Sequence, residues 1–202
     1  MQVSVRTNVQ EITKKLTRIQ RRQIPFATMM ALNETAFGIA RQVMPKQAER
    51  KFDGGATAFT KRGFKYQKAS KLNLESIVYI DKKQLKYMRY QVDGGVRRPN
   101  KKVILTPGYH AKINRYGNIT RANRTKYLSK SDKYIVSDRG VYEVKGKGKS
   151  QQLNKVLNFV KQAKYSPKFH FYRMAEGYIN NPIKGFNPRM SKHLARAIAN
   201  AK

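Results

Sequence analysis

The N-terminal part of the chain carries its hydrophobic residues mostly at the spacing of an α-helix. Residues 2–6 first alternate between polar and apolar side chains, as a short β-strand does. Thr7 and Gln10 then form a capping-box pattern, and the apolar residues that follow are three or four positions apart, up to Ile19. This spacing predicts a helix whose other face is basic.

A second helix is predicted directly after the first. Pro25 is well placed as its first residue, because the N–H that proline lacks has no partner in the first turn of a helix. An apolar stripe runs from Met29 to Val43, and Pro45 is expected to stop or bend the helix. We expect the two helices to pack as a hairpin within residues 1–52.

The middle of the chain has the composition of β-strands. Residues 74–81 and 84–92 are rich in Ile, Val and Tyr, and residues 81–83 suit a hairpin turn between them. A third strand is expected near residues 102–106. Residues 53–146 are therefore predicted to form an antiparallel sheet.

A late hairpin and a long loop belong to the same region. Residues 134–136 and 141–144 are predicted strands, joined through residues 138–140. Residues 107–131 are polar, basic and without clear periodicity. A loop of this length is typical of a functional segment or of one that orders on a partner, with a plain surface insertion as the alternative.

Helical spacing returns in residues 151–202. The apolar residues from Leu153 to Val160 lie at helical intervals, and a helix is expected there. Short helices are also predicted after Phe169 and from Asn187. Helices, strands and helices in this order, within one domain, predict the α+β class: an antiparallel sheet covered by helices from both ends of the chain.

The charge of the chain is its strongest functional signal. It has 44 Lys and Arg against 11 Asp and Glu, a net charge of +33 over 202 residues, and each quarter of the sequence has a positive excess. A folded chain this positive repels itself and is expected to work beside a polyanion, of which nucleic acid is the first candidate. The absence of cysteine excludes disulfides and thiolate chemistry and suits a reducing cytoplasm. We expect no membrane span and no secretion signal.

Residues suited to catalysis are sparse. The three histidines are far apart in sequence and outside metal-binding motifs, so we expect no metal site. The carboxylates are few and scattered, although Glu75, Asp81 and Asp93 could meet on neighbouring strands as in a two-metal nuclease. The histidines are His110, His170 and His193.

One segment resembles part of a phosphate-binding loop. Gly148, Lys149 and Ser150 lie between a predicted strand and a predicted helix, but Glu143 stands where the first glycine of that motif is required. A carboxylate there would repel phosphate, so we interpret the segment as a flexible linker. We therefore expect no cofactor and no enzymatic activity.

Two basic clusters with aromatic neighbours are the candidate binding sites. They lie in residues 59–66 and 94–102, and either could hold a phosphate backbone or stack on unpaired bases. The alternative, which we favour for the rings, is that Phe59 and Phe64 are core residues. The lysines could then be merely solvated. The candidate contact residues are Lys61, Arg62, Lys65, Arg97, Arg98, Lys101 and Lys102.

Several segments resemble a known family. Residues 24–36 follow a basic helix and resemble the opening of the prophage minor tail protein Z group of lambda-like bacteriophages. Residues 52–98 and the aromatic start of a late helix at residues 169–172 are similar to patterns of phage structural proteins. The matching residues of the first segment are Ile24, Pro25, Ala27, Ala31, Leu32 and Asn33.

This resemblance implies a non-enzymatic tail-completion, neck or minor tail protein. Such a subunit would form a ring, with six copies expected, in the head-to-tail region of a virion, after assembly in the host cytoplasm. Its partners would be other tail, neck or portal proteins and the genomic DNA in the channel. Two alternatives stay open: a free nucleic-acid-binding protein without sequence specificity, and a DNA-processing enzyme.

Overall fold

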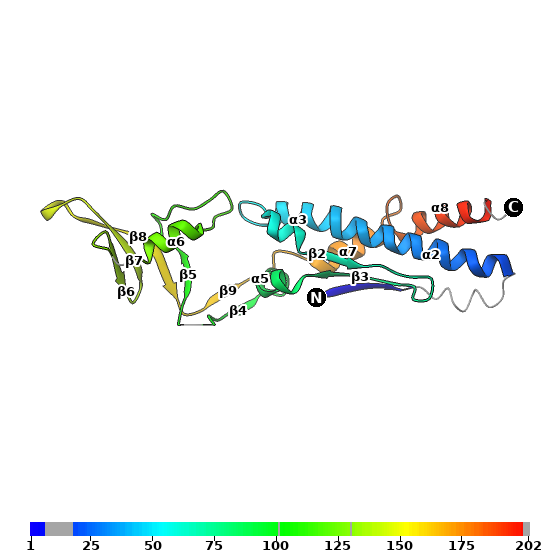
Figure 1. Ribbon diagram of the computed structural model, residues 1–202, viewed down its shortest axis with the longest axis horizontal. Helices are drawn as coiled ribbons and strands as arrows, with labels where there is room; N and C mark the ends of the chain where they lie inside the picture. The colour runs from blue at the N-terminus through cyan, green and yellow to red at the C-terminus, as the bar shows by residue number, and fades with distance from the viewer. Residues whose placement is uncertain (7–17, 101, 130, 200–202) are drawn as a thin grey trace.

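The computed structural model describes residues 1–6, 18–100, 102–129 and 131–199. The molecule is elongated, with a helix-rich body at one end and a strand-rich distal lobe at the other (Figure 1). A narrow ribbon of two strands, β4 (Gly95–Arg97) and β9 (Ala163–Tyr165), joins the two parts. Helices occur towards both chain ends, and the named strands pair antiparallel, so the α+β class is confirmed.

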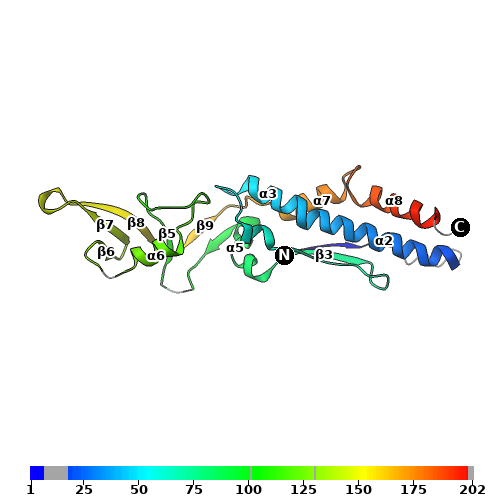
Figure 2. The same ribbon diagram turned by 45° about the horizontal axis from the view of Figure 1, so that its top comes forward.

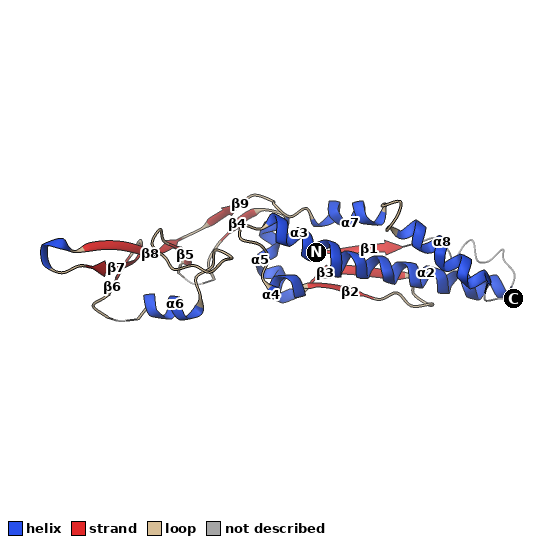
Figure 3. Cartoon of the chain, turned by 90° about the horizontal axis from the view of Figure 1, so that it is seen from above, coloured by secondary structure: helices blue, strands red, loops and turns tan. Residues whose placement is uncertain are grey.

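The longest helix of the body is α2 (Arg18–Gly38). Pro25 lies inside this helix, so the expected break before Pro25 is wrong. The predicted first helix falls mostly on residues 7–17, which lie outside the described residues. Among the described residues, α2 packs along α8 (Phe186–Ala199), and the two helices lie side by side in Figure 3. This pairing joins a helix from the N-terminal part of the chain to the last helix.

Pro45 does not stop the helical chain. After α2, the π-helical turn η1 (Ile39–Val43) leads directly into α3 (Met44–Lys51). The N–H of Met44 donates to the carbonyl of Ile39, five residues earlier, which is the bond of a π-helix. Pro45 follows directly after this π-helical turn, at the second residue of α3, and the helical chain continues through it.

A three-stranded sheet lies against these helices. Its order is β1 (Gln2–Arg6), β3 (Glu75–Ile80) and β2 (Phe64–Gln67), so the predicted strands over residues 2–6 and 74–81 are confirmed. Alternate side chains of β3 are buried, as expected for a strand with one face on a core. That core also contains the stacked rings of Phe64 and Phe169, whose centroids are 5.6 Å apart.

The predicted strand over residues 84–92 is wrong, because this segment forms the helix α5 (Lys82–Val92). Asp81 caps the helix: its Oδ1 accepts a hydrogen bond of 3.0 Å from the N–H of Lys83. Gln84, Met88 and Val92 are four residues apart and buried. The stretch after Asp81 is therefore a helix start rather than a hairpin turn.

Three shorter helices complete the body and the lobe. The helix α4 (Ala58–Arg62) precedes β2, and α7 (Phe171–Ile179) confirms the helix predicted after Phe169. The last helix, α8, confirms the helix predicted near Asn187. The third short helix, α6 (Arg121–Tyr127), lies in the distal lobe.

The distal lobe is built on a four-stranded sheet in the order β5-β8-β7-β6. The predicted hairpin over residues 134–144 is confirmed, and the strand expected near residues 102–106 is present. The helix predicted over residues 153–160 is wrong, since this segment is the central strand β8. The strands are β5 (Ile104–Pro107), β6 (Tyr134–Ser137), β7 (Gly140–Lys145) and β8 (Gln152–Val160).

A β-bulge explains the misleading pattern in β8. Val141 pairs with Leu157, but the next residue, Tyr142, pairs with Lys155, which leaves Val156 as the extra residue. Val156 and Leu157 are both buried, although a regular strand would turn neighbouring side chains to opposite faces. The two adjacent buried residues give the sequence its apparent helical spacing.

Residues 107–131 are more ordered than their sequence indicates. They contain α6, which Thr120 caps, and a β-bridge between Ile113 and Ile119. Tyr127 of α6 packs on Tyr134 with ring centroids 5.6 Å apart, in the core of the distal lobe. The single sheet expected over residues 53–146 is also wrong, because the strands form three separate sheets.

The segment from Gly148 to Ser150 is the turn η2 between β7 and β8. It joins two strands of one hairpin, so it lacks the strand–helix setting of a phosphate-binding loop. In the described part of the chain, no helix is long and apolar enough to cross a membrane.

Candidate functional site

Two contacts between the body and the distal lobe stand out in the part of the chain that the structure describes. The first is the β4–β9 ribbon, whose strand β9 is labelled between the two parts in Figure 2. The second is the loop of residues 108–119, whose backbone at Arg115 and Tyr116 packs directly on Gly54 of the body. We call the region between these two contacts the junction.

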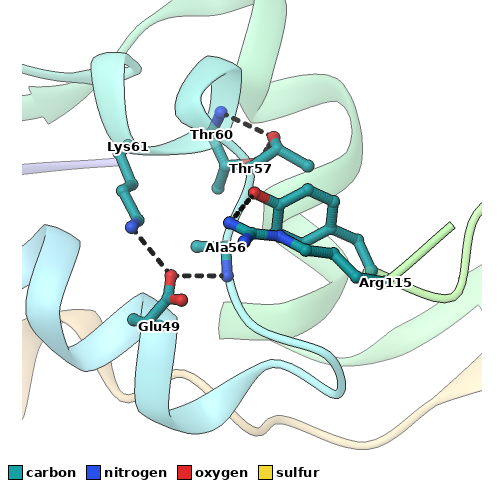
Figure 4. Close-up of polar contacts among 7 residues, drawn as sticks. Glu49, Ala56, Thr57, Thr60, Lys61 and Arg115 are labelled. Atoms are coloured by element: carbon teal, nitrogen blue, oxygen red, sulfur yellow. Dashed lines mark hydrogen bonds and ion pairs between the residues drawn. The ribbon is translucent and has the colours of Figure 1, made fainter.

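Glu49 of α3 organises the body side of the junction (Figure 4). Its Oε2 accepts a hydrogen bond of 3.0 Å from the N–H of Ala56 and lies 2.8 Å from Lys61 Nζ. The contact with Lys61, the bond from Ala56 and the positive charge of Arg115 together hold the pKa of Glu49 below its ordinary value of 4.5. Glu49 is therefore ionised at neutral pH and fixes the start of the loop that leads into α4.

Three hydroxyl groups form a chain beside Glu49. Thr57 caps α4, with its Oγ1 accepting a hydrogen bond of 3.1 Å from the N–H of Thr60. Thr60 Oγ1 lies 2.9 Å from Thr57 Oγ1 and 3.0 Å from the hydroxyl of Tyr87. Burial raises the pKa of Tyr87 above its ordinary 10.0, so the phenol is neutral at physiological pH.

The junction contains a cleft made of two adjoining hollows of about 430 and 250 Å3. We call them together the junction cleft. The larger hollow is within the range of small-ligand sites, roughly 300–1,000 Å3. Body, ribbon and distal loop all contribute to its wall. The two hollows share Thr57, Thr60, Tyr87, Gln91 and Asn118.

Aromatic side chains dominate the larger hollow. Phe59 of α4 is 53% exposed, so the prediction that Phe59 is a core residue is wrong, whereas Phe64 is fully buried as predicted. Tyr90 of α5 and Tyr165 of β9 pack with ring centroids 5.6 Å apart and an angle of 32° between the planes. Arg89 lies 4.8 Å from the Tyr90 ring centroid, as a cation–π contact.

Each hollow also contains one cation. Arg97 of β4 lines the larger hollow, is half-buried, and forms no ion pair with a carboxylate of the described residues. Lys168 lines the smaller hollow and lies 2.9 Å from Asp53 Oδ2. The larger hollow is therefore the one whose positive charge is uncompensated.

The structure separates the predicted contact residues. Lys61 is engaged by Glu49, while Arg62 is exposed at the end of the same short helix, α4. Lys65 is half-buried in β2, away from the cleft lining. Arg97 is the one predicted residue that lines the cleft. The remaining candidates are Arg98 and Lys102, both exposed beyond the ribbon strand, and Lys101, which lies outside the described residues.

The sequence alone did not identify most residues of the cleft. Tyr87, Tyr90 and Gln91 lie at positions i, i+3 and i+4, so they share one face of α5. If residues 84–92 formed a strand, as predicted, Tyr90 would point to the opposite face from Tyr87 and Gln91. Asn118 and Tyr165 come from distant segments, and no local pattern brings them to the junction.

The candidate catalytic groups do not assemble. Asp81 and Asp93 flank α5 at its two ends, so they cannot meet on neighbouring strands with Glu75. His193 of α8 is buried, with its Nε2 2.9 Å from Glu34 Oε1 on α2, and this contact joins the two long helices. Within the described ranges, no three His, Cys, Asp or Glu side chains are grouped to hold a metal ion.

Charge and cleft together make this region the candidate binding surface. The chain is strongly basic, and the larger hollow combines aromatic residues with an arginine that has no carboxylate partner among the described residues, a combination suited to anionic, aromatic ligands. Comparisons of the chain with protein-family models, curated proteins and solved structures find no match.

Proposed function

We propose that the chain is a non-enzymatic structural subunit of a bacteriophage tail or neck that binds DNA without sequence specificity. One observation carries this proposal. Eleven carboxylates can neutralise at most a quarter of the 44 basic side chains, so the folded chain keeps a net charge of +33. Such a charge needs a polyanion beside it in the working state.

The distribution of the charge supports a broad contact rather than a single pocket. Exposed basic residues occur on the body, at the ribbon and on the distal lobe. Arg62, Arg98 and Arg121 are examples from the three parts. A rod-shaped subunit with cations along its length can follow a phosphate backbone without reading bases.

The phage setting is supported by the resemblance of residues 24–36 to the minor tail protein Z group and of residues 52–98 to phage structural proteins. The shape is compatible with it: a ring subunit needs a folded body and an arm that reaches its neighbour. The distal lobe extends away from the body and exposes Ile135, Val136 and Leu153, which suits contact with another protein.

Imaging of virions that carry a tagged copy of the chain tests the setting. The proposal expects several copies, about six, arranged as a ring in the tail or neck. Absence from purified virions, or a single copy per virion, refutes this part. Isolated subunits are a poor test, because their charges repel one another.

A free nucleic-acid-binding protein is the second candidate, and the aromatic junction cleft favours it. Aromatic residues beside a cation, as in the larger hollow, are typical of proteins that bind single strands. Fractionation of infected cells separates the two candidates. A tail subunit sediments with assembled particles after nuclease treatment, whereas a free binding protein is released when its nucleic acid is digested.

A further inference from the structure

The larger hollow of the junction cleft is lined by aromatic residues on which the paired bases of duplex DNA cannot stack. Its wall contains the rings of Phe59, Tyr90 and Tyr165. A duplex keeps its bases stacked inside, so only its phosphates reach a protein wall of this kind. Unpaired bases expose their faces and stack on aromatic side chains.

Phe59 is the ring best placed for stacking. It is 53% exposed on the short helix α4, so about half of the residue's surface is accessible. The main chain of Phe59 is held in place, because its carbonyl accepts a hydrogen bond of 2.9 Å from Gln84 Nε2. The ring is therefore exposed on a fixed backbone.

The other groups of the hollow fit the remainder of a nucleotide. Arg97 has no carboxylate partner among the described residues, so its guanidinium is available for a phosphate. The amides of Gln91 and Asn118 line the same wall and can donate and accept hydrogen bonds at a base edge. The ion pair of Asp53 with Lys168 belongs to the smaller hollow.

We propose that the larger hollow binds single-stranded nucleic acid, with a base stacked on Phe59 and a neighbouring phosphate at Arg97. This inference rests on the proposed function, that the chain binds nucleic acid, and adds that the ligand has unpaired bases. It also assigns the site to the junction, where body and distal lobe meet.

Four probes test it, with binding followed by the quenching of tyrosine fluorescence or by anisotropy of a labelled strand. The first is a thymidine oligonucleotide of about 15 nucleotides, close to the upper site size of single-strand binders. The second is an abasic strand of the same length, which keeps the phosphates and removes the bases. A duplex with the same number of phosphates and thymidine monophosphate are the third and fourth.

The intact protein should bind the thymidine strand at least about fivefold more tightly than the abasic strand, since each stacked base is worth roughly 1–3 kcal/mol. Phe59→Ala should reduce this ratio towards one and leave binding of the abasic strand unchanged. Tyr172→Ala is the matched control, because Tyr172 is also exposed, at 44%, but lies on α7 outside the cleft. That variant should keep the ratio.

Three results would overturn the inference: equal binding of thymidine and abasic strands, an equal loss of both in Phe59→Ala, or binding of thymidine monophosphate as tight as that of the strand. Binding of the duplex shows whether only this inference fails or the proposed function fails with it. If the base-dependent ratio is absent while duplex DNA still binds, the cleft assignment fails and DNA association stands. If neither duplex nor strand binds, both fail.

Discussion

Gly54 of the body and the carbonyl oxygen of Arg115 in the distal lobe lie so close that a Cβ at position 54 would stand 2.5 Å from that oxygen. The backbone of Gly54 has a φ of +75°, a conformation that L side chains rarely adopt. Glycine is therefore required at position 54 for two reasons: the positive φ, and the close approach of the backbone at Arg115. This contact connects the body to the distal lobe in addition to the β4–β9 ribbon.

Gly54→Ala should loosen this closure. The substitution adds a strained backbone conformation, worth roughly 1–3 kcal/mol, and a clash with the backbone of Arg115. Gly117→Ala is the matched control, because Gly117 has a similar φ of +73° but open space around its Cβ position. We expect denaturant unfolding to show a larger loss for Gly54→Ala. Equal losses would mean that the close approach contributes nothing.

Glu49→Gln should change the pH dependence of stability. The carboxylate has a lowered pKa in the folded state, so its stabilising effect is present above its ordinary pKa of 4.5 and is lost as the pH falls through the lower folded value. The glutamine of this variant would keep an acceptor for the Ala56 N–H but not the charge that pairs with Lys61. The difference in unfolding free energy between the two proteins should therefore shrink below pH 4.5.

Asp53→Asn is the control for that experiment. Asp53 is 91% exposed in its pair with Lys168, and exposed pairs contribute little to stability. Its replacement should leave the unfolding free energy near neutral pH almost unchanged. If the difference in unfolding free energy between the wild type and Glu49→Gln stays constant down to acid pH, the Glu49 charge does not have the role given to it here.

Asp81→Ala should destabilise the body by about 1 kcal/mol, because the N-cap of α5 loses the acceptor for the Lys83 N–H. Asp81→Asn should lose much less, since asparagine is an equally good N-cap residue. Thermal or denaturant unfolding of both variants measures the difference. Equal losses in both variants would indicate that the charge of Asp81, and not its capping bond, is what matters.

Tyr127→Phe tests the order of the distal lobe. The hydroxyl of Tyr127 accepts a hydrogen bond of 2.9 Å from the backbone N–H of Lys112, so α6 holds the preceding loop in place. Its removal should cost about 1 kcal/mol and speed proteolysis within residues 108–119. Tyr109→Phe, at a ring that is 95% exposed, should change neither property. An unaltered cleavage rate in Tyr127→Phe would show that the loop is held by other contacts.

The sequence predicted the class and many elements of the fold, and its errors have definite causes. Asp81 and Gln84 are three residues apart, which is also a capping-box spacing, but the Tyr and Val residues that follow favoured a strand. The helix prevails because Gln84, Met88 and Val92 bury one face in the body. Tertiary packing thus decided between two local patterns.

The candidate site was less accessible from the sequence than the fold. Arg97 was identified from its charge, but the rings around it come from α4, α5 and β9, and their meeting depends on the ribbon. The bulge at Val156 concealed the strand that leads back to β9. Interactions between distant segments leave no periodic signal in a single sequence.

The salt dependence of duplex DNA affinity tests the central claim most directly. If phosphate contacts are the source of binding, the logarithm of the affinity should fall linearly with the logarithm of the salt concentration. The affinity should drop by orders of magnitude between roughly 50 and 200 mM salt, and equally for DNA of unrelated sequences. Replacing both Arg97 and Arg98 with Ala should lower the slope by roughly one per lost contact. An affinity that is insensitive to salt, or a marked preference for one sequence over a scrambled competitor, would contradict the account.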